Sequence, residues 1–203
     1  MMGIDQITLY KAKAPRKFPF RTSKAVQHSV DGVFVEVMIG DATGTGEVAP
    51  RPHINGETLD GAYEQMQLIA KLIMGKYPEQ AVDILHTSET GPSARLGMEM
   101  AIYDAFTQNG GRAICDYFGN SGRSSVSYCG FMSSDESNEK LVKKATTFKD
   151  KGYEIVRAKV GELPFEDDLK RVTQLRAIFG AEVKIWLDVN QAWSTDDAAD
   201  FAA

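Results

Sequence analysis

Two apolar runs in the second half of the chain end in charged or amide side chains, which leaves few folds open to it. Residues 183–190 read VKIWLDVN, a series of strand-forming side chains that ends in a polar cluster. Side chains alternate along a strand, so Trp186, Asp188 and Asn190 are expected to share one face. Because a carboxylate is costly to bury alone, we place Asp188 at the carboxyl end of a parallel strand, where it can meet a cation.

The other run lies one βα unit earlier and ends in cations. Residues 154–161 read EIVRAKVG, which places Ile155, Arg157 and Lys159 on one face of a strand. A lysine beside a guanidinium and a metal loses its proton more readily, because like charge disfavours its charged form. Lys159 is therefore a candidate general base at the end of its strand.

Strands and helices alternate from residue 124 onward. We predict strands over 126–132, 154–161 and 183–190, and helices over 133–151 and 164–180, with Ser194 capping a last helix. The helix over 133–151 is predicted to begin with a capping box made by Ser133 and Glu136. The inner face of the helix that follows Pro164 is predicted to consist of Leu169, Val172, Leu175 and Phe179.

The first part of the chain has a different pattern. It predicts antiparallel strands around residues 7–10 and 33–48, loops over 15–22 and 49–58, and helices near 59–73 and 93–109. A three-stranded meander of this kind can pack one face on helices. The fold class predicted for the whole chain is thus an α+β domain over 1–123, followed by a parallel α/β region over 124–203.

These motifs resemble a known family. The two strand ends read Arg157-Ala158-Lys159 and Asp188-Val189-Asn190. They are similar to the Lys-x-Lys and Asp-x-Asn motifs that end the second and third barrel strands of the enolase superfamily, in its muconate-lactonizing enzyme/mandelate racemase group. The resemblance implies that Lys159 is the general base beside a carbanion centre and that Asp188 binds Mg²⁺.

Further motifs extend the resemblance over essentially the whole chain. Those of the family's N-terminal capping domain are matched by Gly44-Thr45-Gly46-Glu47, by Asn55-Gly56-Glu57-Thr58 and by residues 100–105. The resemblance implies that Phe20, Arg21 and His53 lie in two loops that fold over the barrel mouth and shape specificity. Asn190 is then a substrate contact or a support for the metal ligand.

Arg157 stands where the family usually has the first lysine of its motif. Two roles stay open for it. It can pair with an acidic residue deeper in the barrel, or it can bind the substrate carboxylate through its planar fork.

The resemblance also implies a (β/α) TIM-type barrel that is incomplete in this sequence. Such a barrel takes eight βα units over ~250 residues, whereas three strands are predicted here. We therefore expect the N-terminal part of a longer enzyme, or a truncated product. The family's remaining metal carboxylates and its opposite-face base have no counterpart in these residues.

Charge and composition argue against two classes of partner, nucleic acids and membranes. A net charge of −5 argues against nucleic-acid binding, which uses a basic face. No apolar run reaches the ~20 residues that span a bilayer, and no signal peptide is recognised, so a cytoplasmic protein without a membrane partner is expected. We also expect a homo-oligomer.

The implied function is Mg²⁺-assisted removal of the proton α to a carboxylate of a small-molecule substrate. The enolate then leads to racemisation or epimerisation, or to cycloisomerisation of the muconate-lactonizing type. Elimination by a sugar-acid or amino-acid-type dehydratase of the same superfamily is an alternative. Two other classes stay open: a Schiff-base enzyme that uses Lys159, and a non-catalytic fragment.

Overall fold

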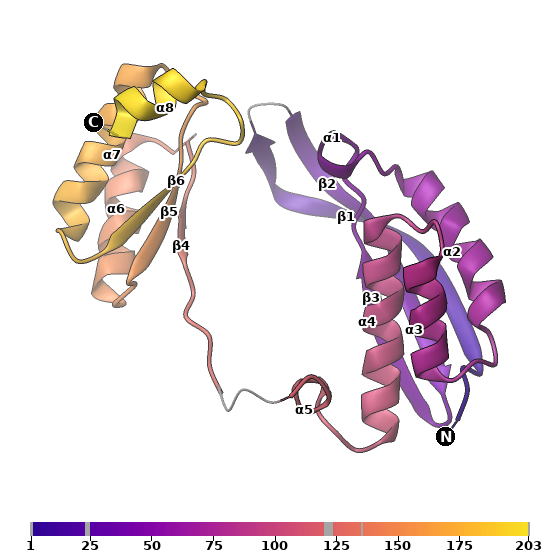
Figure 1. The fold of residues 1–203 in the computed structure, drawn as a ribbon. Helices are drawn as coiled ribbons and strands as arrows, with labels where there is room; N and C mark the ends of the chain where they lie inside the picture. Colours follow the sequence, from indigo (N-terminus) through magenta and orange to yellow (C-terminus); the bar gives the residue numbers. More distant parts are fainter. Residues whose placement is uncertain (1, 23–24, 120–123, 135, 203) are drawn as a thin grey trace. The chain divides into compact units, whose positions relative to one another are not determined.

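The computed structural model describes residues 2–22, 25–119, 124–134 and 136–202, without the side chains of residues 18, 21, 22 and 25. The chain divides into two compact units (Figure 1). The first comprises Met1–Pro19 and Gln27–Arg123, and the second comprises Phe20–Val26 and Ser124–Ala203. The second unit is therefore discontinuous in sequence. No helix of the described residues is long and apolar enough to cross a membrane.

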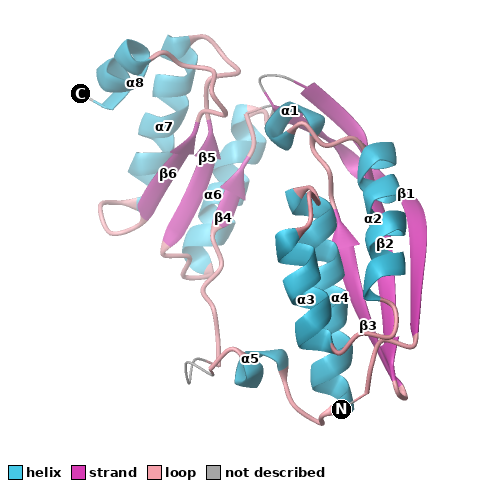
Figure 2. Cartoon of the chain, turned by 45° about the vertical axis from the view of Figure 1, so that its right-hand side comes forward, coloured by secondary structure: helices cyan, strands magenta, loops and turns pink. Residues whose placement is uncertain are grey.

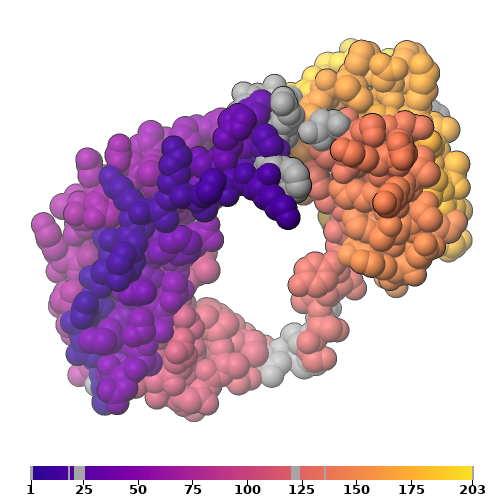
Figure 3. Space-filling view, turned by 180° about the vertical axis from the view of Figure 1, so that it is seen from behind, coloured from indigo at the N-terminus to yellow at the C-terminus, as the bar shows by residue number. Residues whose placement is uncertain are grey.

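The sheet of the first unit has the order β1-β2-β3, formed by β1 (Gln6–Thr22), β2 (Ala25–Ile39) and β3 (Ala42–Val48). Strands β2 and β3 are antiparallel, with Val33 opposite Val48 and Ile39 opposite Ala42. The predicted loop over 15–22 is wrong, because this segment continues β1. Its two prolines are tolerated there because β1 is an edge strand of the sheet. In the space-filling view, the indigo start of the chain lies along the surface of this unit (Figure 3).

Helices cover one face of this sheet (Figure 1). They are α2 (Leu59–Ile73), α3 (Pro78–Thr87) and α4 (Pro92–Asn109). The unit also contains the single turns α1 (Pro52–Asn55) and α5 (Ile114–Tyr117), which have no buried residues. Helix α2 begins where Thr58 Oγ1 accepts a hydrogen bond from Gly61 N at 3.1 Å. Val33, Val35 and Val37 of β2 are fully buried against α2, α3 and α4 in one apolar core. Sequence periodicity predicted α2 and α4 but missed α3 and the single turns α1 and α5.

Helix α4 packs so closely on β3 that the main chains of the two elements are in contact. A Cβ added to Gly46 would lie 1.9 Å from the carbonyl oxygen of Gly97, and one added to Gly44 would lie 2.2 Å from that of Ala101. A Cβ on Gly97 would in turn lie 2.3 Å from Val48 Cγ2. The Gly44-Thr45-Gly46 motif thus has a packing role, since hydrogen is the only substituent that fits between strand and helix.

We expect Gly46→Ala to lower the free energy of unfolding by about 3 kcal/mol, because the added methyl group forces β3 and α4 apart. Urea unfolding followed by circular dichroism measures the change. Gly110→Ala is the matched control, because its Cβ would meet its nearest neighbour at 3.5 Å, an ordinary contact. A Gly46→Ala variant as stable as this control would contradict the packing role.

The second unit contains a sheet of order β4-β5-β6, formed by β4 (Gly130–Met132), β5 (Ile155–Lys159) and β6 (Lys184–Asp188). Both strand pairs are parallel, as the sequence predicts. Helices α6 (Asn138–Asp150) and α7 (Phe165–Phe179) pack on one face of the sheet (Figure 2), and α8 (Thr195–Ala202) follows β6. Among the described residues, this sheet has three strands and is open.

The largest departures from the predicted boundaries in this unit are at the starts of α6 and β4. Helix α6 begins after Ser137, whose side chain accepts a hydrogen bond from Lys140 N, and not at the predicted Ser133. Strand β4 is limited to Gly130–Met132, although a strand was predicted from residue 126. Its partner β5 begins at Ile155, one residue before the Val156 that pairs with Gly130, so residues 126–128 have no part of β5 beside them.

The predicted cap of α8 is observed. Ser194 Oγ accepts a hydrogen bond from Asp197 N at 3.1 Å, and Asp197 Oδ2 accepts bonds from Ser194 Oγ at 2.8 Å and Ser194 N at 3.1 Å. These bonds from Ser194 lower the pKa of Asp197 below its ordinary value. Because the pKa is depressed in the folded state, the bonds stabilise the helix start above the ordinary pKa of an aspartate. This contribution is lost as the pH falls through the depressed value.

We expect Ser194→Ala to raise the pKa of Asp197 toward its ordinary value, because the variant removes the hydroxyl donor. A carboxyl-carbon NMR titration measures the shift. Thr195→Ala is the control and should leave the Asp197 titration unchanged, since it keeps Ser194. Equal titration midpoints in all three proteins would contradict the assigned cause.

Candidate active site

The register of the parallel sheet brings the predicted site residues together at the carboxyl ends of β5 and β6. Lys159 lies opposite Asp188, and Arg157 lies opposite Trp186. A guanidinium nitrogen of Arg157 forms an ion pair with Asp188 Oδ2. Lys159 Nζ lies 3.9 Å from the same oxygen and donates a hydrogen bond to Asn190 Oδ1. One carboxylate therefore serves two cations.

The two cations, Lys159 and Arg157, differ in how far their side chains are exposed to solvent. The Lys159 side chain is 2% exposed, whereas that of Arg157 is 44% exposed and that of Asp188 is 20% exposed. A buried ammonium needs charged or polar partners, and Asp188 and Asn190 supply them. The ring of Phe20, which belongs to the same unit, lies 5.1 Å from Lys159 Nζ, within the range of a cation–π contact. Lys159 is thus the amine that the site shields from water.

Asn190 reaches Lys159 through a turn. Strand β6 ends at Asp188, and Asn190 and Gln191 have positive φ angles of 49° and 63°. The main-chain nitrogen of Asn190 donates a hydrogen bond to Asp188 Oδ1 at 3.3 Å. The prediction that strand alternation places Asn190 beside Asp188 had the right outcome for the wrong reason. Asparagine tolerates the left-handed conformation, and this tight turn directs its side chain back to the lysine.

Arg157 lies between two neighbours on the same face of the sheet. Its guanidinium carbon lies 6.0 Å from the centre of the Phe131 ring on β4, and its other contact is the ion pair with Asp188 on β6. The sequence left two roles open for Arg157. The structure contains an ion pair, but the acidic partner is Asp188 at the strand end and not a residue deeper in the barrel. Binding of the substrate carboxylate stays a prediction.

The donor set at this strand end fits part of a site for a hard divalent cation. Asp188 offers carboxylate oxygens, which Mg²⁺ prefers, while the side-chain oxygen of Asn190 is engaged by Lys159. No group of three or more His, Cys, Asp or Glu side chains suited to a metal occurs among the described residues. These residues therefore fit one ligand of a magnesium ion and not a complete coordination sphere.

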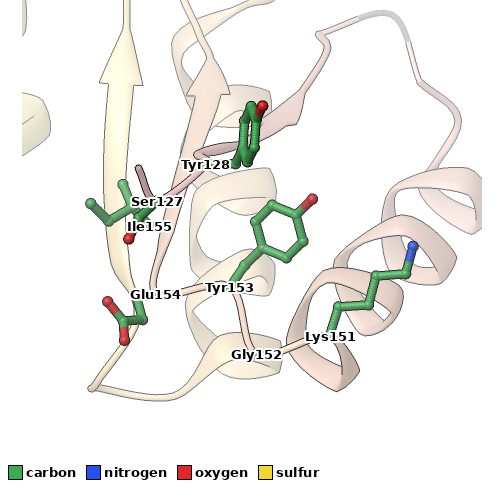
Figure 4. A pocket seen from close by; sticks show the side chains of 7 residues that line it. All are labelled: Ser127, Tyr128, Lys151, Gly152, Tyr153, Glu154 and Ile155. Atoms are coloured by element: carbon green, nitrogen blue, oxygen red, sulfur yellow. The ribbon is translucent and has the colours of Figure 1, made fainter. Parts of the chain in front are cut away.

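Two hollows lie at opposite ends of the sheet. One of about 330 Å³ adjoins the site and is lined by Arg157, Trp186, Leu187, Asp188 and Asn190. The other, of about 260 Å³, lies where the strands begin (Figure 4). There the side chains of Lys151 and Glu154 stand on opposite sides of the hollow, so no acid–base pair forms. The hollow beside Asp188 is the candidate substrate site.

The structure gives different amounts of information on the three predicted specificity residues, Phe20, Arg21 and His53. Phe20 lies by Lys159, as described above. His53 lies on α1 in the first unit and is exposed. The side chain of Arg21 lies outside the described residues. The roles of Arg21 and His53 stay predictions.

Sequence reasoning missed two charged residues of α7, Asp168 and Arg171. It assigned Leu169 to the inner face, but Leu169 is 37% exposed, and the buried residues of this helix are Asp168, Leu175 and Phe179. Spacings of seven and four residues join these three positions, so the helical period could have indicated Asp168. An apolar pattern search passes over a buried aspartate.

Two family profiles match this chain. The one described as MenC, N-terminal domain, matches residues 4–105, and the one described as Enolase C-terminal domain-like matches residues 140–203.

Curated relatives and solved structures match along nearly the whole chain. The L-Ala-D/L-Glu epimerase of Bacillus subtilis (strain 168) is 27% identical over 203 residues, which cover 97% of this chain and 55% of the relative. The D-Ala-D/L-Ala epimerase of Cytophaga hutchinsonii is 28% identical, with coverage of 97% and 54%. The dipeptide epimerase from Enterococcus faecalis V583, solved with Mg and the dipeptide L-Leu-L-Tyr, aligns at 27% identity with a TM-score of 0.83, covering 98% of this chain and 57% of that one. The chain spans about half the length of the curated relatives it matches.

Proposed function

This chain belongs to the muconate-lactonizing enzyme/mandelate racemase group of the enolase superfamily, and from this membership we propose that its protein is a racemase or epimerase. The reaction removes the proton α to a carboxylate and returns a proton to the same carbon. The observation that carries the proposal is the shielded Lys159 amine beside Asp188 at the strand end. We propose further that residues 1–123 form the capping domain and 124–203 the first part of the barrel.

Lys159 is proposed as the base. Its Nζ takes the α-proton, and the electron pair of the broken C–H bond moves into the carboxylate as an enolate. Lys159 keeps this proton, and the epimer forms when a second acid on the other side of the substrate donates its own proton to the opposite face of that carbon. Burial of Lys159 serves this step, because water that reached the amine would compete for its proton.

Asp188, through a bound Mg²⁺, and Arg157 are proposed to stabilise the negative charge of the enolate. Asp188 would hold Mg²⁺, which when bound supplies positive charge close to the substrate carboxylate. Arg157 adds a second, always-charged group on the same face of the sheet. Asn190 accepts a hydrogen bond from Lys159 and thereby fixes the direction of the amine.

Dipeptides are the proposed substrates. The support comes from the relatives, among which L-Ala-D/L-Glu and D-Ala-D/L-Ala epimerases stand beside a dipeptide complex. A relative from Bacillus cereus described as an N-succinyl-L-Arg/Lys racemase makes N-acylated amino acids the alternative substrates. Both classes present an amide next to the carbon that bears the proton.

Exchange of the α-proton in D₂O tests this proposal independently of the product. The full-length protein, supplied with Mg²⁺, is incubated with L-Ala-L-Glu, L-Leu-L-Tyr and an N-succinyl amino acid, and the α-proton signal is followed by NMR. Loss of the signal with a dipeptide, accompanied by appearance of the epimer, is the expected result. Retention of the signal with every compound would overturn the proposed activity.

A further inference from the structure

A buried ion pair on α7 lies behind the end of β5. Arg171 Nη1 lies 3.0 Å from Asp168 Oδ1, with the Asp168 side chain 0% and the Arg171 side chain 13% exposed. One residue earlier on the same helix, Asp167 and Lys170 form a pair of the same spacing at 3.6 Å, with side chains 54% and 76% exposed. Two pairs with the same spacing thus differ in burial.

The buried pair is bonded to the main chain at Lys159 itself and two residues further along, at Gly161. Arg171 Nη1 donates to the carbonyl oxygen of Lys159 at 3.2 Å, and Asp168 Oδ2 accepts from the amide of Gly161 at 2.6 Å. Arg171 Nη2 donates to the carbonyl oxygen of Ser133, just after β4, at 2.7 Å. The pair therefore fixes the chain that leaves β5 and ties it to the chain that leaves β4.

The segment held by Asp168 also touches the turn that carries Asn190. Gly161 has a positive φ of 87°, and a Cβ there would lie 2.8 Å from Ala192 Cβ and 3.1 Å from Val189 Cγ1. A shift of Gly161 would therefore press on residues 189–192. The partner of the Lys159 amine lies within that segment.

From this geometry we propose that Asp168 and Arg171 are positioning residues, which set the Lys159 amine at its place against Asp188 and Asn190. The inference rests on the proposed function, in which Lys159 is the base. Its physical reason is geometric. A buried ion pair contributes little net stability compared with apolar side chains of the same size, whereas charge-assisted bonds to two carbonyl groups and an amide define a backbone position.

Disrupting the Asp168–Arg171 pair should lower the rate of the reaction and leave substrate binding unchanged. A displacement of about 1 Å in a reacting group can lower a rate by about 10²-fold. We therefore expect Arg171→Met to lower kcat for α-proton exchange by about 10²-fold while KM stays nearly constant. Arg171→Lys keeps the charge but lacks the fork, and should recover part of the rate. Asp168→Asn keeps an acceptor for Gly161 and should be milder than Arg171→Met.

The experiment compares these variants in the full-length protein with the exposed pair as control. Lys170→Met and Asp167→Asn are the matched changes and should keep kcat and KM. A second readout uses no substrate: reductive methylation of Lys159, quantified by mass spectrometry in protein shown to be folded by its circular dichroism. Arg171→Met should raise the labelling rate of Lys159 severalfold, whereas Lys170→Met should not.

Each outcome decides one question. If the native protein exchanges no α-proton, the proposed function fails, and the labelling of Lys159 still tests the positioning role. If the folded Arg171→Met variant matches Lys170→Met in both kcat and labelling, the positioning role is overturned while the proposed function stands. A fall in kcat that only follows a lower folded fraction would likewise make the pair structural, and the milder Asp168→Asn variant provides a folded protein for that comparison.

Discussion

Replacing Lys159 with alanine is expected to lower the rate of hydrogen exchange at the α-carbon of the substrate by about 10³-fold. The variant removes the buried amine that Asp188 and Asn190 hold in place. The measurement is solvent deuterium incorporation by the full-length protein. Lys184→Ala is the matched control, because Lys184 lies at the start of β6 and is exposed.

Stability separates the chemical role of Lys159 from a structural one. Lys159→Met keeps most of the apolar stem and removes the buried charge, so it should lose exchange as fully as the alanine variant while remaining folded. Undiminished exchange in either variant would mean that the base lies elsewhere. Trapping of a carbonyl substrate on Lys159 by borohydride would favour the Schiff-base alternative instead.

Asp188→Asn is expected to abolish Mg²⁺-dependent turnover of the full-length protein. The substitution removes the carboxylate that, among the described residues, contacts both Arg157 and Lys159 and suits a hard cation. Leaving the two cations without this partner should lower the free energy of unfolding by about 2 kcal/mol. Urea unfolding without Mg²⁺ measures the loss of stability. Repeating it with Mg²⁺ measures binding of the ion, because an ion that binds the folded state stabilises it by mass action.

The matched control for this change is Asp167→Asn on the exposed face of α7. It should retain turnover and the stabilisation by Mg²⁺. Full activity of Asp188→Asn in the presence of a chelator would show that Asp188 is not a metal ligand. Activity lost without any change in the response of unfolding to Mg²⁺ would assign Asp188 to the pairing of Arg157 and Lys159 alone.

The sequence predicted the strand ends well because their signals are local. Period-two alternation placed Arg157 and Lys159 on one face, and the parallel register then put Lys159 opposite Asp188. Asn190 shows the limit of that reasoning, since a turn with a positive φ angle brings it to the lysine. Such a turn is set by the fit to neighbouring segments, which an alternation rule does not contain.

The missed features depend on contacts between distant segments. Helix α6 begins at Asn138, and the carbonyl group of Ser133, where a cap was predicted, instead accepts a bond from Arg171, 38 residues further along the chain. The prolines of β1 argued locally for a loop, but pairing in the sheet prevailed. Asp168 was overlooked because its burial is explained only by Gly161 and Arg171 together.

The glycine contact between β3 and α4 has a consequence for hybrid proteins assembled from related chains. Gly44 and Gly46 face the backbone of α4, and Gly97 faces that of β3, so neither element tolerates a partner with a side chain at the facing position. A recombination point placed between residues 49 and 91 would separate the two halves of this interlocking contact. Strand β3 and helix α4 should therefore be exchanged together as one cassette, whatever the origin of α2 and α3 between them.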